Sequence, residues 1–141
     1  MLRFERTPDF DQFKQVLLRR GEPQRVPFYE LFADVEIMEA ILGRSIQNGP
    51  ADILEFQLTL GYDYVMAWIG NLHFAMKGLE TAPDTAQLSR GERTYRVANM
   101  KTITSWEDFE TYPWPDPTHA DYSQIETYAR LMPEGMRVLV P

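Results

Sequence analysis

Residues 129–140 read ARLMPEGMRVLV, and this stretch decides the fold. Pro133 and Gly135 end a helix, because proline lacks the amide N–H and glycine accepts the left-handed conformation that closes a helix. Met136–Val140 then forms a short apolar strand. A strand that follows a helix so closely is typical of α/β folds, where it joins a parallel sheet.

Two stretches upstream predict further strands of this sheet. Tyr64–Ile69 is apolar at almost every position, as a parallel strand that is covered on both faces requires. Phe28–Phe32 is rich in residues that favour β-structure, although Pro27 precludes a fully paired central position near its start. A helix from Asp34, its N-cap, to Leu42 follows at once. This order predicts parallel crossover units.

The remaining helices have their own boundary signals. Residues 1–24 are predicted to form a helical arm, in which Thr7 and Pro8 begin the helix and Gly21 ends it. A helix that starts near Pro50 precedes the Tyr64–Ile69 strand and ends at Gly61.

An excursion from the main sheet separates that strand from the last helix. Residues 72–80 and 93–103 predict a hairpin or a similar excursion. Ser105 with Asp108 resembles a capping box that opens a short helix. The proline-rich stretch YPWPDP at residues 112–117 then forms a stiff, extended connector.

Composition excludes several classes of function. The net charge is −7, from 21 acidic and 14 basic residues, so the surface repels nucleic acid and anionic lipid. The chain has no cysteine, which excludes disulfides, zinc–thiolate sites and thiol catalysis within it. No apolar run approaches the length of a membrane span or a signal peptide. We therefore expect a cytoplasmic protein that binds neither nucleic acid nor membranes.

Four stretches together resemble the N-terminal part of the uroporphyrinogen decarboxylase family, which also contains corrinoid- and coenzyme M-type methyltransferases. They are RVPFYELFADVEIMEAILGR at 25–44, LTLGYDYV at 58–65, TITSWEDFETYPWPDP at 102–117 and ARLMPEGMRVLV at 129–140. None is diagnostic alone, and the resemblance rests on their order and spacing.

The resemblance implies the first part of a (β/α)8 barrel: about three parallel strands with flanking helices and a hairpin excursion, forming one partial domain over residues 1–141. Such barrels need about 250 residues and place their chemistry at the carboxyl ends of the strands. We therefore expect a truncated product, a fragment or one part of a split enzyme, which is inactive alone.

Departures from the decarboxylase pattern favour the methyltransferase-like members. Where decarboxylases carry an arginine-containing segment that grips substrate carboxylates, this chain has Glu30 and Asp34, which repel an acidic tetrapyrrole. The zinc ligands of the methyltransferase-like members belong to a later part of the barrel. This segment is thus expected to hold no cofactor, whereas a complete member implies zinc and a corrinoid.

Four residues at the expected strand ends are the candidate site. Glu30 is a candidate catalytic carboxylate, or a solvent-facing residue that caps the next helix. His73 is a candidate acid–base residue, although an isolated histidine is more often simply hydrogen-bonded. Tyr29 and Asn71 are candidate substrate-binding residues, and Tyr29 cannot face the same side of a strand as Glu30. No metal ligands are predicted.

Other polar and aromatic residues favour structural roles. Asp63 precedes its strand and is read as a turn or cap residue. Trp106, Tyr112 and Trp114 surround the proline connector, where they either stack on a planar ligand or, as we favour, pin the connector.

Two functional hypotheses follow. The chain is the N-terminal segment of a barrel enzyme that decarboxylates a tetrapyrrole or, in preference, transfers methyl groups to or from a corrinoid, with the missing barrel half or a corrinoid protein as partner. Alternatively, it is a small α/β protein that forms a homodimer through open sheet edges and binds a ligand or partner without catalysis.

Overall fold

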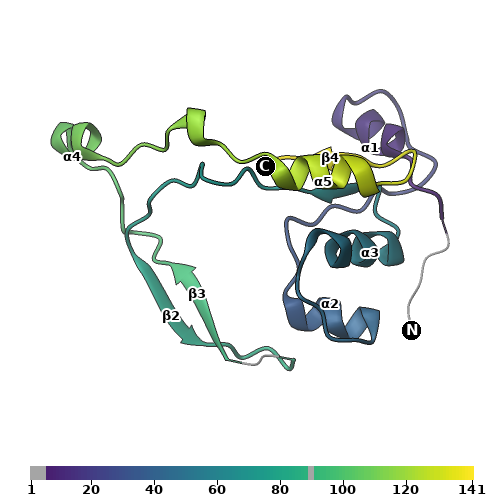
Figure 1. The fold of residues 1–141 in the computed structure, drawn as a ribbon, viewed down its shortest axis with the longest axis horizontal. Coiled ribbons are helices and arrows are strands. Elements are labelled where there is room, and N and C mark those ends of the chain that lie inside the picture. Colours follow the sequence, from purple (N-terminus) through teal and green to yellow (C-terminus); the bar gives the residue numbers. More distant parts are fainter. Residues whose placement is uncertain (1–5, 89–90) are drawn as a thin grey trace. The chain divides into compact units, whose positions relative to one another are not determined.

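The computed structural model describes residues 6–88 and 91–141. These residues divide into two compact units, each described by itself: a strand–helix unit (residues 6–69 and 122–141) and a hairpin unit (residues 70–121). The elements shown in Figure 1 are α1 (Phe10–Leu17), α2 (Val35–Leu42), α3 (Pro50–Leu60), β1 (Tyr64–Met66), β2 (Leu79–Pro83), β3 (Glu92–Arg96), α4 (Trp106–Thr111), the 3-10 helix η1 (Pro117–His119), α5 (Ser123–Leu131) and β4 (Arg137–Leu139).

The strand–helix unit is built on a parallel pair of strands. β1 pairs with β4, with Tyr64 opposite Arg137 and Met66 opposite Leu139. The amide of Ala67 donates to the carbonyl of Leu139 at 2.9 Å, which extends the ladder beyond the strands. The helix-to-strand reading of residues 129–140 and the parallel direction are thereby confirmed. The strand predicted at Tyr64–Ile69 is confirmed in its first half only.

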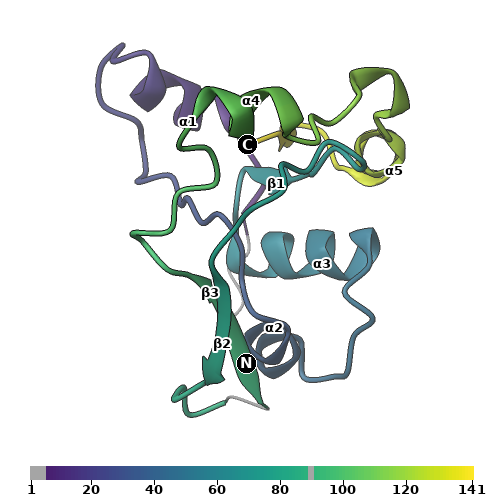
Figure 2. The same cartoon turned by 90° about the vertical axis from the view of Figure 1, so that its left-hand side faces the viewer.

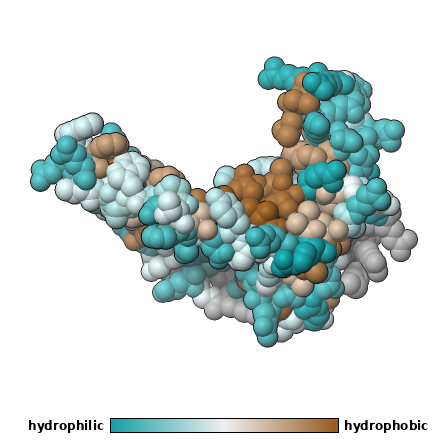
Figure 3. Space-filling model, turned by 45° about the horizontal axis from the view of Figure 1, so that its top comes forward, coloured by the Kyte–Doolittle hydropathy of each residue, from teal (hydrophilic) through white to brown (hydrophobic). Residues whose placement is uncertain are grey.

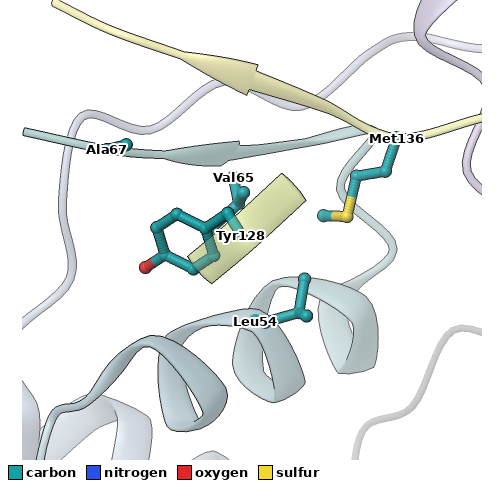
Figure 4. Packing of buried hydrophobic residues seen from close by; sticks show 5 residues of the cluster. All are labelled: Leu54, Val65, Ala67, Tyr128 and Met136. Atoms are coloured by element: carbon teal, nitrogen blue, oxygen red, sulfur yellow. The ribbon is translucent and has the colours of Figure 1, made fainter. Parts of the chain in front are cut away.

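Both faces of β1 are covered, as its continuous apolarity predicts. Val65 and Ala67 pack with Leu54 of α3 and Tyr128 of α5 on one face. Figure 4 shows the Tyr128 ring between the strand that carries Val65 and the helix that carries Leu54. Tyr64 and Met66 point to the other face and pack with Phe13 of α1. The three residues of β1 are therefore all buried.

Local sequence signals place most helix boundaries correctly. α2 and α3 end at Gly43 and Gly61, which adopt positive φ angles of 69° and 74°, a conformation that glycine tolerates best. Asp34 occupies the N-cap position of α2, as expected. α1 instead begins at Phe10, with Asp9 as its N-cap, because the Asp9 side chain accepts the amide of Asp11. Only the part of the predicted arm from residue 6 onward lies within the described residues.

The strand predicted at Phe28–Phe32 is wrong. These residues are irregular, and Tyr29, Leu31 and Phe32 are exposed. The segment is held by a side chain instead of by pairing with another strand. The hydroxyl of Tyr64 accepts a hydrogen bond from the Glu30 amide and donates one to the Glu30 carbonyl. The described residues therefore contain two parallel strands rather than about three, and they form no closed barrel.

A partly buried ion pair joins the N-terminal segment to the residue that precedes β1. The carboxylate of Asp63, 1% exposed, accepts the Arg25 guanidinium and the amide of Asp9, the latter at 2.8 Å. Arg6 donates to the carbonyl of Gly61 in the same region, and burial beside the charge of Arg25 lowers its pKa. The structural reading of Asp63 gains direct support from these contacts.

The hairpin unit begins and ends at one bridged pair. Gly70 and Asp121 exchange two backbone hydrogen bonds of 2.9 Å, and a Cβ on Gly70 would lie 3.0 Å from that of Asp121. Within the unit, β2 and β3 pair antiparallel, as both Figure 1 and Figure 2 show. The predicted excursion is therefore a hairpin. The predicted capping box is also confirmed. The Ser105 hydroxyl accepts a hydrogen bond from the backbone amide of Asp108, and the Asp108 carboxylate accepts one from the backbone amide of Ser105.

Within the described residues, no helix has the length and apolarity needed to cross a membrane.

Candidate functional site

An apolar groove opens where the two parallel strands end. It has a volume of about 490 Å³ and is lined by Phe13, Val16, Leu17, Pro27, Tyr29, Met66, Leu139, Val140 and Pro141. Met66 and Leu139 are the last residues of β1 and β4, so the groove lies at the carboxyl ends of both strands. Figure 3 shows hydrophobic surface, in brown, at the centre of the view and again at its upper right, beside polar surface in teal. Parallel α/β sheets generally place ligands at this end.

Tyr29 enters the groove from the irregular segment. Its ring centroid lies 6.0 Å from that of Phe13 and 5.8 Å from that of Tyr64. Tyr29 remains 57% exposed although its ring packs on Phe13 and Tyr64, so part of its surface is available to a ligand. The predicted substrate-binding residue Tyr29 therefore does line a candidate pocket.

Tyr64 fixes the position of Tyr29 through the neighbouring backbone. Its hydroxyl lies 2.6 Å from the Glu30 nitrogen and 2.7 Å from the Glu30 oxygen. Burial raises the pKa of the Tyr64 hydroxyl to about 12. The hydroxyl thus stays neutral at physiological pH, and it can donate one hydrogen bond while accepting the other.

Glu30 contacts this cluster without lining the groove. Its side chain is exposed, and its negative charge adds to burial in raising the pKa of Tyr62. Tyr62 packs edge-on against Tyr64, with centroids 5.7 Å apart. Glu30 is therefore a carboxylate beside a tyrosine cluster. A catalytic role for it stays a prediction.

Asn71 and His73 belong to the hairpin unit, whereas Tyr29 and Glu30 belong to the strand–helix unit. Asn71 adopts a positive φ of 62°, and its amide nitrogen donates to the carbonyl of His119 at 3.1 Å. This contact gives Asn71 a structural task inside its unit. His73 is exposed on the same segment. Their proposed substrate-binding and catalytic roles stay predictions.

The described part of the chain offers no set of side chains that would bind a metal ion. The described residues contain no group of three or more histidine, aspartate or glutamate side chains placed to hold a metal ion.

Sequence reasoning missed the residues that shape the groove. The sequence predicts no role for Phe13 beyond membership of the helical arm at residues 1–24, and it predicts Tyr64 only as part of a strand. Their convergence joins segments that are far apart in the chain: the hydrogen bonds of Tyr64 reach across 34 positions to Glu30. The one available signal was the density of aromatic residues in 10–32 and 62–64.

Comparisons with known proteins add no assignment, because no family model, curated protein or solved structure matches this chain.

Proposed function

We propose that this chain is the N-terminal segment of a barrel enzyme of the uroporphyrinogen decarboxylase family, nearer its methyltransferase-like members, and that it is inactive alone. One observation carries the proposal: the parallel β1–β4 pair is covered by α3 and α5 on one face and opens onto the apolar groove at its carboxyl ends. A strand–helix–strand unit of this kind is what the start of such a barrel requires.

The groove, with a volume of about 490 Å³, suits one flat, weakly polar face of a substrate rather than a whole macrocycle. Its lining is mostly aliphatic and aromatic, with Tyr29 presenting a ring face. The nearby carboxylate of Glu30 and the net charge of −7 disfavour a polyanionic tetrapyrrole. Methyl transfer to or from a corrinoid is therefore preferred over decarboxylation of a tetrapyrrole.

The test uses the natural gene, including any coding sequence that follows the codon for Pro141. We expect an in-frame continuation that supplies histidine and cysteine ligands, and a purified product that transfers methyl groups between methylcobalamin and a thiol. Tyr29→Ala should raise KM for the corrinoid about tenfold, because the stacking face is lost. Tyr95→Ala, on β3, is the matched control and should leave KM unchanged.

Two results contradict the proposal. One is a natural stop codon directly after Pro141. The other is a folded full-length product that neither transfers methyl groups nor releases CO2 from uroporphyrinogen. Release of CO2 without methyl transfer would retain the family and reverse the preferred reaction.

A second candidate function is a non-catalytic homodimer that binds a ligand or partner, and the free edge of β4 favours it. Among the described residues, β4 pairs with β1 alone. The amide of Arg137 and the carbonyl of Leu139 bond to the β1 side, so the backbone groups of Val138 face the other edge. An exposed edge beside an apolar groove is a template for strand addition.

Light scattering at several concentrations tests the homodimer. A dimer that Val140→Lys disrupts supports it, because Val140 lines the groove beside the edge. Val26→Lys is the control, since Val26 is 78% exposed and outside the groove lining. A monodisperse monomer at all concentrations would eliminate the homodimer.

A further inference from the structure

The hairpin unit presents a second aromatic surface, separate from the groove. We call it the α4 aromatic surface, and its rings are Phe74, Trp106, Phe109, Tyr112 and Trp114. Trp106 and Phe109 stack with centroids 5.1 Å apart at 17°, and Phe109 meets Trp114 at 5.0 Å and 62°. Trp114 also contacts Tyr112 at 4.6 Å and Phe74 at 6.3 Å. Each ring therefore supports its neighbour.

The polar atoms of this surface are already satisfied inside the unit. Trp106 Nε1 donates to Glu110 Oε1 at 2.9 Å, and Trp114 Nε1 donates to the Phe109 carbonyl at 3.1 Å. Tyr112 Oη donates to the Ala75 carbonyl at 2.7 Å. These bonds fix the ring orientations in advance, so that binding through the ring faces loses little side-chain entropy.

The rings are nevertheless open to solvent. Trp106 is 71% exposed, and Trp114 is 48% exposed. A hollow of about 450 Å³ adjoins them, lined by Lys101, Ile103, Thr104, Ser105, Trp106 and Phe109. Exposed aromatic surface that is rimmed by polar residues marks an interaction site more often than chance.

The charge around the rings selects the partner. Residues 101–121 contain one lysine, Lys101, against five acidic residues. The carboxylate of Asp108 is engaged by Thr104, Ser105 and Lys77, which hold its pKa well below the usual range. Glu107 and Glu110 remain exposed on α4 beside Trp106. Glu110 lies one helical turn from Trp106 and already accepts a hydrogen bond from its Nε1, so a cationic group on the exposed indole face would lie within reach of this carboxylate.

We propose that the α4 aromatic surface binds an arginine-bearing, extended segment of another protein. A guanidinium stacks on an indole face while its N–H groups reach a carboxylate, a combination that suits Trp106 with Glu110. A second copy of this chain fits less well, because each copy carries a net charge of −7. A planar anion would meet the exposed carboxylates of Glu107 and Glu110, and Lys77 is already paired with Asp108.

The experiment is a calorimetric titration of the whole chain with three six-residue peptides. Each peptide alternates glycine with one charged residue: arginine, lysine or glutamate. We expect the arginine peptide to bind, the lysine peptide to bind about threefold more weakly, and the glutamate peptide not to bind. Trp106→Leu should weaken arginine-peptide binding about fivefold, because leucine keeps apolar volume and loses the π face. Trp106→Phe should stay within about twofold of the parent chain, since phenylalanine retains a ring.

Glu110→Gln should weaken binding about threefold and reduce its dependence on salt. Tyr95→Ala, an exposed aromatic on β3, should change nothing. Equal affinity for the arginine and glutamate peptides, or unaltered binding by both Trp106→Leu and Glu110→Gln, overturns the proposal. Self-association that Trp106→Leu abolishes overturns it in favour of a second copy. If Trp106→Leu lowers the melting temperature, the Trp106→Phe and Glu110→Gln titrations decide.

Discussion

At the residue scale, two buried tyrosines differ in whether their hydroxyl groups form hydrogen bonds. Tyr64 Oη makes two hydrogen bonds to the Glu30 backbone, which hold the segment that carries Tyr29. Tyr128 is fully buried, and its hydroxyl has no hydrogen-bond partner among the described residues. An unsatisfied buried hydroxyl costs stability, whereas a satisfied one contributes to it.

The same substitution should therefore have opposite effects at the two positions. Tyr64→Phe is expected to lower the free energy of unfolding by about 1–2 kcal/mol, because both bonds to Glu30 are lost. Tyr128→Phe should leave it unchanged or raise it by up to about 1 kcal/mol. Urea denaturation monitored by circular dichroism measures both. A loss at Tyr128 as large as that at Tyr64 would mean that the Tyr128 hydroxyl has a partner.

Both hydroxyls also predict instability in alkali. Burial raises the pKa of Tyr64 and of Tyr128 to about 12, from 10 in the unfolded chain. Between these values the folded state holds protons that the unfolded state releases, so the free energy of unfolding falls as pH rises from 10 to 12. The contribution is fully present below pH 10. Urea denaturation at pH 9 and at pH 11.5 measures the loss of unfolding free energy between these pH values. Replacing both tyrosines by phenylalanine should make this loss smaller, and an equally large loss in the double variant would refute the assignment.

At the element scale, Gly135 controls how the turn before β4 meets the start of α1. Its φ is 84°, and a Cβ there would lie 2.1 Å from the carbonyl oxygen of Pro8, while its own carbonyl accepts the Phe10 amide at 2.9 Å. Gly43, at the end of α2, also has a positive φ, yet no atom lies within 4 Å of an added Cβ. The two glycines separate backbone strain from steric clash.

Gly43→Ala should cost about 1 kcal/mol, from the left-handed backbone alone. Gly135→Ala should cost at least about 2 kcal/mol more, because a backbone carbonyl cannot move aside as a flexible side chain can. Thermal unfolding of the two variants gives the comparison, and hydrogen exchange at the Phe10 amide should accelerate only in Gly135→Ala. Equal losses of stability in the two variants would show that the backbone at Pro8, before α1, moves at little cost to admit the added Cβ.

The same elements show where sequence reasoning succeeds. The ends of α2 and α3 were predictable because a glycine in the left-handed conformation is a local signal. The β1–β4 pair was predictable from continuous apolarity and from the helix that precedes β4. Phe28–Phe32 was wrongly predicted as a strand because pairing depends on a distant partner, and that partner is the Tyr64 side chain. The groove around Tyr29 depends on the same distant contact.

At the scale of the whole molecule, the hairpin unit is an insertion between β1 and α5. The hydrogen-bonded pair Gly70–Asp121 closes it at its base. Replacing residues 71–120 by Asn-Gly, which forms a tight two-residue turn, should leave the strand–helix unit folded. The shortened chain retains Trp68 as its single tryptophan.

Cooperative unfolding followed by Trp68 fluorescence, with a melting temperature within about 5 °C of the parent chain, is the expected result. A molten product, or one without cooperative unfolding, would mean that the strand–helix unit needs the inserted residues. The control replaces only residues 85–88, which follow β2, by the same dipeptide.

The Gly70–Asp121 pair also bears on how the chain folds. β1 and β4 pair residues that lie far apart in sequence, such as Val65 with Val138, and long-range parallel pairing is slow because a large loop must close first. Once the backbones of Gly70 and Asp121 are hydrogen-bonded, the loop that must close for β1 to pair with β4 contains only the residues outside the insertion. Lengthening the hairpin should then leave the folding rate of the sheet almost unchanged, whereas breaking the pair should slow it.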